Sequence, residues 1–156
     1  MRAITVLILV MVGLLVAIVA VQPRPAAAED RWAAVPDVQA SLERIRQRIL
    51  LEAAIQRTSQ RARGHPDWIE AEWFERPLPM NPWFDGRHPW IEIASEADQG
   101  REHPRCIVAL EPDDGTFWYD PLSGVVRARV PKGLMDDQAI ALYNAANGVE
   151  VDSILP

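Results

Sequence analysis

The chain has a single cysteine, Cys106, among its 156 residues, and this scarcity excludes one way of stabilising a small domain. One thiol cannot form an intrachain disulfide, although small domains carried across a membrane often depend on several. Cys106 also stands inside an apolar run, where a cysteine usually acts as a small core residue, and the sequence identifies no activating base for it. Any globular part of this chain must therefore be held together by packing.

Basic residues are scarce in the second part of the chain. Residues 64–156 contain 7 Lys and Arg against 17 Asp and Glu, a formal charge of roughly −10, whereas residues 1–63 contain 9 against 5. Affinity for nucleic acid depends on clustered Lys and Arg that neutralise phosphates. Arg127 and Arg129 are the only close basic pair in residues 64–156, and strand alternation predicts that both face water. The composition excludes nucleic acid as a partner.

Motifs of the common enzyme classes are also missing. There is no Gly-rich phosphate loop and no Gly-x-Ser-x-Gly elbow. His65, His88 and His103 each precede a proline, which favours extended backbone, and they lie too far apart for the usual spacing of zinc ligands. We therefore predict a protein that is not an enzyme, with no catalytic residues, no cofactor and no metal.

Three carboxylates are weak candidates for a calcium site, namely Asp113, Asp114 and Asp120. Carboxylate oxygens suit calcium, but the spacing of these residues matches no calcium-loop pattern. A solvated hairpin tip is the simpler interpretation.

What the chain does have is an uncharged apolar run over residues 4–21. A run of roughly 18 residues can cross a bilayer as a helix, so we predict a transmembrane anchor over residues 1–25 that contacts membrane lipid. Its anchoring side chains are Ile4, Leu7, Val10, Leu14, Ile18 and Val21. Arg2, the one charge before the run, places the N-terminus in the cytoplasm. The alternative is a secretory signal cleaved after Ala28, because small residues occupy positions 26–28.

An amphipathic helix is predicted over residues 37–61, within a linker and stalk that covers residues 26–63. Its apolar stripe recurs at steps of four and three residues, at Val38, Leu42, Ile45 and Ile49. Two interpretations stay open: the stripe packs on the protein's own sheet, or it also contacts neighbouring copies.

Short strands are predicted in residues 64–156. Residues 88–93 and 105–110 read as strands, and residues 116–130 read as a hairpin whose turn spans residues 120–124. A last helix is expected over residues 136–146, ended by Asn147 and Gly148. The predicted fold class is α+β, with a long N-terminal helix (transmembrane part plus amphipathic stalk) packed on a small antiparallel sheet.

Tryptophan is abundant, and four of the six crowd into one Pro-rich segment. Trp68, Trp73, Trp83 and Trp90 could form an aromatic surface for a partner or a carbohydrate. Alternatively, they supply buried area to a thin core that has no disulfides.

Three stretches occur in the order found in type IV pilins and type II secretion pseudopilins, which the chain resembles. They are the apolar run with Gly13 ending near Pro23, the Pro-x-Asn-Pro motif of residues 79–82, and residues 116–126. The last stretch is similar to a pseudopilin hairpin, with Trp118, Tyr119, Pro121 and Gly124 at the motif positions. Two family features are missing, a leader ending in Gly and a Glu near the fifth mature residue, where Thr5 stands instead.

The resemblance implies a non-enzymatic envelope protein, a structural or accessory component of a type II secretion or type IV pilus-like assembly. It would act through helix packing and head-domain contacts with other pilin-like subunits or secretion-system components. The implied localisation is the inner membrane, single-pass, with a periplasmic head of residues 64–156. The alternative is a secreted or membrane-tethered binding module that uses a Trp-rich surface.

Overall fold

The computed structural model describes residues 26–57 and 64–156. The chain divides into two units, residues 1–31 and residues 32–156, and all strands belong to the second. In chain order the elements are α2 (Ala26–Ala33), α3 (Val35–Arg57), a short 3₁₀ helix η1 (Ala71–Trp73), β1 (Ile91–Ile93), β2 (Val108–Ala109), β3 (Phe117–Asp120), β4 (Val125–Ala128), β5 (Val130–Pro131) and α4 (Asp136–Asn147).

The helix predicted over residues 37–61 begins at Val35 as α3, and a separate helix, α2, occupies part of the predicted linker and ends before Ala34. Pro36 has no N–H and cannot bond to the carbonyl four residues earlier, so a helix arriving from residue 33 cannot run through it unbroken. The N–H groups of Asp37 and Val38 both donate to the carbonyl of Ala34 at 3.1 Å, which begins the first turn of α3.

No helix within residues 26–57 and 64–156 combines the length and the apolar composition needed to cross a bilayer. The predicted single-pass, inner-membrane localisation and the transmembrane part of the fold class are therefore contradicted. Helix α3 has the length, but Arg44, Arg46 and Arg48 stand in its middle. The run over residues 4–21, from which those predictions came, lies outside the described residues. The predicted divisions after residues 25 and 63 stay predictions.

The β-structure is mixed, not antiparallel as predicted. In the three-stranded sheet β1-β3-β4, β1 pairs parallel to β3 and β3 pairs antiparallel to β4. Strands β2 and β5 form a second, parallel pair. A parallel pair needs a long crossover, and residues 94–116 provide it between β1 and β3. The first two strands are also shorter than the runs that predicted them.

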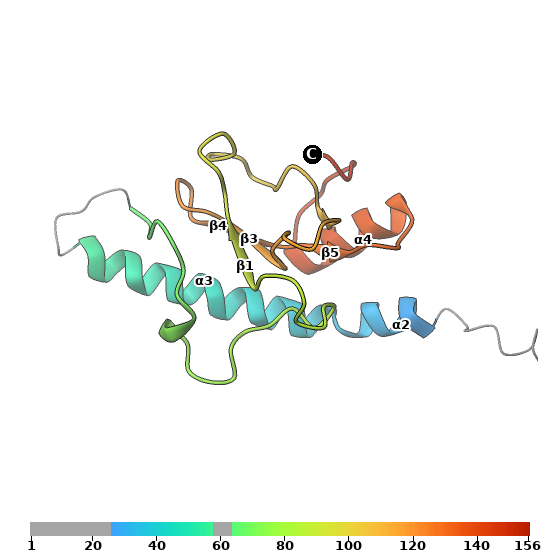
Figure 1. The fold of residues 1–156 in the computed structure, drawn as a ribbon, viewed down its shortest axis with the longest axis horizontal. Coiled ribbons are helices and arrows are strands. Elements are labelled where there is room, and N and C mark those ends of the chain that lie inside the picture. Colours follow the sequence, from blue (N-terminus) through green and yellow to red (C-terminus); the bar gives the residue numbers. More distant parts are fainter. Residues whose placement is uncertain (1–25, 58–63) are drawn as a thin grey trace, which may run out of the picture. The chain divides into compact units, whose positions relative to one another are not determined.

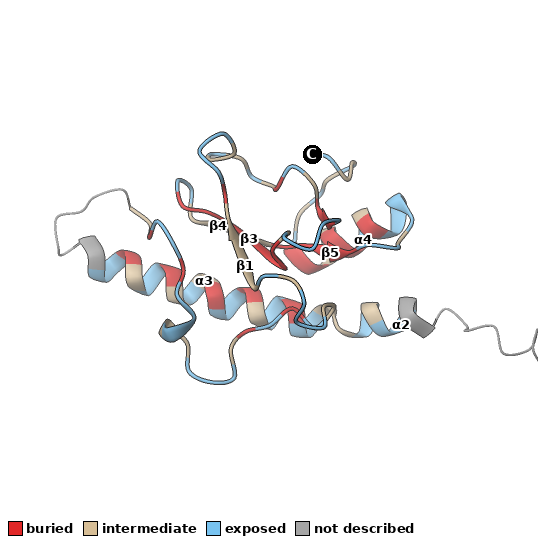
Figure 2. Cartoon of the chain, viewed as in Figure 1, coloured by how far each residue is buried: buried red, intermediate tan, exposed pale blue. Residues whose placement is uncertain are grey.

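Two clusters of buried side chains make up the core of residues 32–156. The first lies between α3 and the inner face of β3 and β4 (Figure 1). The second joins α4 to β2 and β5. Figure 2 shows buried residues recurring along α3 with exposed residues between them, as an amphipathic helix requires. Helix α4 ends at Gly148, whose left-handed conformation lets its N–H donate to the carbonyl of Asn144 at 2.9 Å.

Candidate functional site

The apolar stripe of α3 lies inside the protein's own core. Val38, Leu42 and Ile45 have no exposed surface and Ile49 is 2% exposed. They belong to the same buried cluster as the inward-facing side chains of the hairpin, Phe117, Tyr119, Val126 and Ala128. A fully covered side chain cannot contact a second molecule, so this stripe is occupied by the intramolecular contact.

A second apolar surface lies on the outer side of α3 and was not recognised from the sequence. Leu50 is 64% exposed, and Leu51 and Ile55 are each about half exposed. Residues four apart lie on one helix face, so Leu51 and Ile55 are neighbours there. The signal that could have found this surface is the presence of apolar residues between the positions of the buried stripe. We call Leu50, Leu51 and Ile55 the outer ridge of α3.

The predicted hairpin residues form a tightly packed unit. Trp118 and Tyr119 lie in β3, and both are buried, although successive strand residues face opposite sides of a sheet. The Tyr119 hydroxyl donates to the carbonyl of Pro66 at 2.7 Å, and burial raises the pKa of this phenol. Pro121 is buried at the first position of the turn. These residues therefore serve packing.

Gly124 and Asp120 close the hairpin turn. Gly124 has φ of +74°, which favours glycine, and a Cβ added there would lie 2.5 Å from Nδ1 of His65. The fully buried carboxylate of Asp120 accepts hydrogen bonds from the N–H groups of Leu122, Ser123 and Gly100 and from the Ser123 hydroxyl. The Asp120 oxygens are thus already used to hold the turn.

The three calcium candidates do not converge. Asp113 is exposed, Asp114 accepts from the N–H groups of Leu110 and Glu111, and Asp120 closes the hairpin turn. Within the described ranges, no group of three or more histidine, cysteine or acidic side chains is placed to hold a metal ion.

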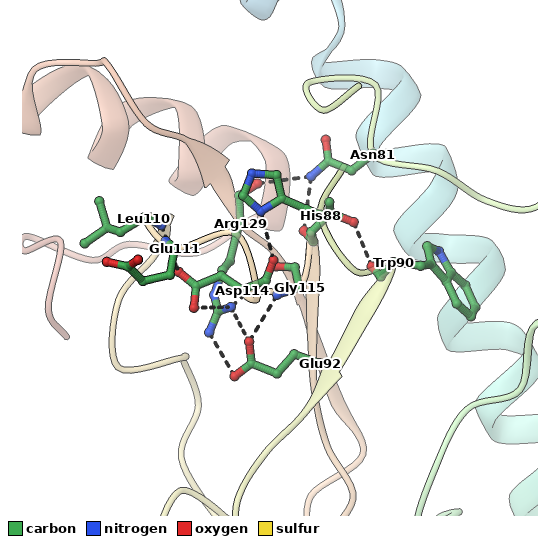
Figure 3. A network of polar contacts seen from close by, with 10 residues as sticks. Asn81, His88, Trp90, Glu92, Leu110, Glu111, Asp114, Gly115 and Arg129 are labelled. Carbon is green, nitrogen blue, oxygen red and sulfur yellow. Dashed lines mark hydrogen bonds and ion pairs between the residues drawn. The ribbon is translucent and has the colours of Figure 1, made fainter. Parts of the chain in front are cut away.

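Asp114 instead belongs to a polar network around Arg129 (Figure 3). The Arg129 side chain is only 6% exposed, which corrects the expectation that it faces water. Its Nη1 and Nη2 donate to the two carboxylate oxygens of Glu92, at 2.5 and 3.2 Å. A carboxylate oxygen of Asp114, Oδ1, lies 3.8 Å from Nη1. A buried guanidinium needs such partners, because an unpaired buried charge is strongly destabilising. Its Nε is buried and has no hydrogen-bond partner among the described residues.

Asn81 ties the Pro-x-Asn-Pro motif to the hairpin. This buried side chain donates from Nδ2 to the carbonyls of Thr116 and Arg129, at 3.2 and 3.0 Å (Figure 3). Its Oδ1 accepts from the N–H of Trp83 at 3.2 Å. The sequence singled out the motif by resemblance but did not reveal that its asparagine bridges two distant segments.

A cleft of about 350 Å³ opens beside this network. Its lining residues are Trp83, Phe84, Asp85, Arg87, His88, Pro112, Pro131 and Lys132. Nδ1 of His88 lies 3.1 Å from the carbonyl of Asp114, which can only accept, so Nδ1 carries the proton and Nε2 is an acceptor in the neutral ring. Hydrogen bonds from Arg87 lower the pKa of Asp85 to about 2. The cleft therefore combines aromatic faces with two cations and one firmly ionised carboxylate.

The crowded tryptophans divide between core and surface. Trp73, Trp83 and Trp90 are partly buried against the first cluster, and the indole of Trp90 donates to the carbonyl of Pro79 at 2.6 Å. Trp68 is exposed and donates to Glu70. Most of this segment's aromatic area thus supports the core, and Trp83 contributes to both core and cleft.

The three histidines lie in separate places. His65 packs against the hairpin turn, His88 lines the cleft, and His103 contacts the hydroxyl of Tyr143 at 3.0 Å. In the part of the chain that is described, no histidine hydrogen-bonds a serine, a cysteine or a carboxylate. Cys106 is half-buried at the edge of the second cluster.

No protein-family model matches this chain, and no curated protein or solved structure is significantly similar to it.

Proposed function

We propose that this protein is a non-enzymatic, pilin-like structural or accessory component of a type II secretion or type IV pilus-like assembly, and that it acts through protein–protein contacts. The observation that carries the proposal is the meeting of the motifs behind the resemblance. Asn81 of the Pro-x-Asn-Pro motif bonds to both ends of the hairpin region, and the hydroxyl of Ser41 in α3 donates to the carbonyl of Met80 at 2.8 Å. Two side chains, Ser41 of α3 and Asn81 of the motif, thus join the helix, the motif and the hairpin to one another.

The chemistry of the described residues favours contact over catalysis. A nucleophile or general base must lie within hydrogen-bond reach of the group that activates it. His65 and His103 are used in packing, and Asp120 and Asp114 are used to hold loops. These groups stabilise the fold, which fits a protein whose surface does the work.

The outer ridge of α3 is the contact surface that the proposal assigns. Leu51 and Ile55 stand on the helix face away from the core cluster and Leu50 stands at its side, and the occupant we assign is the α3 of a second copy. Exposed apolar patches commonly mark such contacts, and helices pack through apolar ridges. A contact of α3 with its own kind leaves the buried stripe undisturbed.

Cysteine crosslinking of the full chain tests this assignment. In a Cys106→Ser background, Leu50→Cys places a thiol on the outer ridge, and Met135→Cys is the matched control because Met135 is 62% exposed and equally apolar. Oxidation should join copies through position 50 and not through position 135, as read by non-reducing gel electrophoresis. Equal yields at the two positions would contradict the proposal.

A second candidate function, a small-ligand binding module, is favoured by the cleft at Trp83, Phe84 and His88. Its volume of about 350 Å³ falls in the range of small-molecule sites, and Arg87 and Lys132 suit an anionic ligand. Titration with a uronic-acid trimer, followed by tryptophan fluorescence, tests it. Binding that is lost in Trp83→Ala and kept in Trp68→Ala would establish the cleft as a site, and no saturable signal would exclude this ligand class.

A further inference from the structure

The free edge of β4 is protected by side chains. The backbone N–H of Arg129 donates to the carbonyl of Thr116 in the strand alongside. Because backbone groups alternate in direction along an antiparallel pair, those of residues 127 and 125 also point toward β3, and those of Val126 and Ala128 point away from it. The amide of Asn147 from α4 satisfies Ala128, accepting from its N–H at 2.8 Å and donating to its carbonyl at 3.0 Å. The carbonyl of Val126 instead lies near the guanidinium groups of two arginines.

Two guanidinium groups converge on that carbonyl. Nη2 of Arg46, from α3, and Nη1 of Arg127, from β4, each lie 3.5 Å from the oxygen of Val126. These are long contacts, since such bonds are usually near 2.9 Å. Arg127 also donates from Nε to the carbonyl of Glu102 at 3.1 Å. The two cations are therefore held close together by neutral carbonyls.

Neither guanidinium forms an ion pair within 4.0 Å with a carboxylate of the described residues. Burial, together with the charge of Arg46, lowers the pKa of Arg127, against the opposing effects of Tyr143 and Glu102. Neither Arg46 nor Arg127 has a guanidinium N–H that is both buried and without a hydrogen-bond partner. The N–H groups of these side chains that make no hydrogen bond therefore reach solvent. Two like charges with free donors form a receptor for an anion.

The surface next to Arg127 is concave, although neither Arg46 nor Arg127 lines the hollow itself. A hollow of about 200 Å³ is lined by Arg101, Glu102, His103 and Pro156, and Glu102 is the residue whose carbonyl Arg127 binds. Arg101 also lines the hollow, and its guanidinium donates to the carbonyls of His103 and Pro156.

The charge distribution of the chain selects the ligand. A planar guanidinium fork matches a carboxylate, and residues 64–156 carry carboxylates in excess. The same 17 acidic residues make a second copy of the chain a source of carboxylates, whereas α3 contributes Arg46 from the basic part. We infer that Arg46 and Arg127 form a carboxylate-binding site that receives an acidic side chain of a second copy of this chain. This inference rests on the proposed function, since it names a contact through which copies would associate.

Sedimentation velocity of the full chain, over a range of concentrations and at low and high salt, tests the inference. The variants are Arg46→Gln, Arg127→Gln and, as a control of equal charge change, Arg105→Gln, an exposed arginine whose partner is Asp98. Circular dichroism checks that each variant folds. Arg46→Gln is the safer variant, because among the described residues the only hydrogen bond of the Arg46 side chain is the long contact with Val126.

The inference expects salt-sensitive self-association that weakens roughly tenfold or more in Arg46→Gln and in Arg127→Gln, the loss of one charge-assisted bond. Arg105→Gln should stay within about twofold of the wild type. Self-association that is unchanged in both variants overturns the carboxylate site, while crosslinking through Leu50→Cys would still support the proposed function. A chain that stays monomeric at every concentration overturns the site, and loss of the position-50 crosslink would separately overturn the assembly proposal.

Discussion

The hairpin β3–β4 and the segment of residues 64–90 lie in the same compact unit but are held by different means. The hairpin keeps its shape by backbone pairing over four residues of each strand and by a turn closed from within. Residues 64–90 contain five of the 13 prolines, which cannot donate from their backbone, and η1 is their one regular element. Their course is fixed by a few side chains, chiefly Asn81 and Trp90. Where backbone pairing is missing, single side chains carry more of the stability.

The largest expected effect is at the place where the two regions touch, Gly124 against His65. In Gly124→Val a β-branched residue would need positive φ and would also collide with the His65 ring, so we expect a loss of about 3 kcal/mol in unfolding free energy. Gly133→Ala is the control, because Gly133 has a similar φ and open space around it, and should lose only about 1 kcal/mol. Urea unfolding measures both. Equal losses would mean that the contact with His65 is unimportant.

Asn81→Ala tests whether a single side chain holds the Pro-rich segment. The carbonyl of Arg129 loses its partner, while that of Thr116 keeps the N–H of Arg129, so we expect a loss of about 2 kcal/mol. Gln138→Ala, at an exposed position of α4, should change the unfolding free energy by less than about 0.5 kcal/mol. Thermal melts followed by circular dichroism are sufficient. A melting temperature equal to that of the control would contradict the role of Asn81.

Tyr119→Phe removes the hydrogen bond that joins the hairpin to Pro66 and keeps the buried ring. Loss of one buried bond should lower the unfolding free energy by about 1 kcal/mol. Trp68→Phe removes an exposed side-chain bond, to Glu70, and should be nearly neutral. If the two variants unfold at the same urea concentration, the bond to Pro66 contributes nothing.

The smallest effect concerns His103, in another segment without regular structure. Burial, then the charge of Arg127, lowers the pKa of His103 below its usual value of about 6.5, so the unfolded chain binds this proton at a higher pH than the folded chain. Folded-state stability should therefore fall as pH drops below about 6.5 and recover as pH rises. His103→Gln should flatten this dependence, as read from urea midpoints between about pH 5 and pH 8. An identical pH profile in the variant would exclude His103 as the source.

Much of the hairpin could be predicted because its signals are local. Residues 120–124 specify a turn, and Gly124 does adopt the positive φ that such turns need. The stripe of α3 was equally visible, and its four residues are buried. The end of α4 at Gly148 also followed from its capping residues, and α3 begins at Val35, two residues before the start that Pro36 and Asp37 predicted.

Other features depended on residues far apart in the sequence. Arg129 was expected to face water because alternation cannot say what covers the outer face of a strand. In the structure Glu92, 37 residues earlier, and the loop carrying Asp114 cover it. The parallel pairing of β1 with β3 was missed for the same reason, because a short apolar run does not indicate which strand it pairs with or whether the pair is parallel or antiparallel. The convergence of Arg46 and Arg127 joins residues 81 positions apart.

The sequence by itself determined where the turn, the helix ends and the apolar stripe lie, because those features depend on residues within a few positions of one another. Only the tertiary structure decided that the stripe is covered by the chain's own sheet and that Arg129 is buried. It likewise decided that the guanidinium groups of Arg46 and Arg127 both approach the carbonyl of Val126. Burial and pairing are properties of contacts between distant segments, and short-range patterns carry no information about which segments meet.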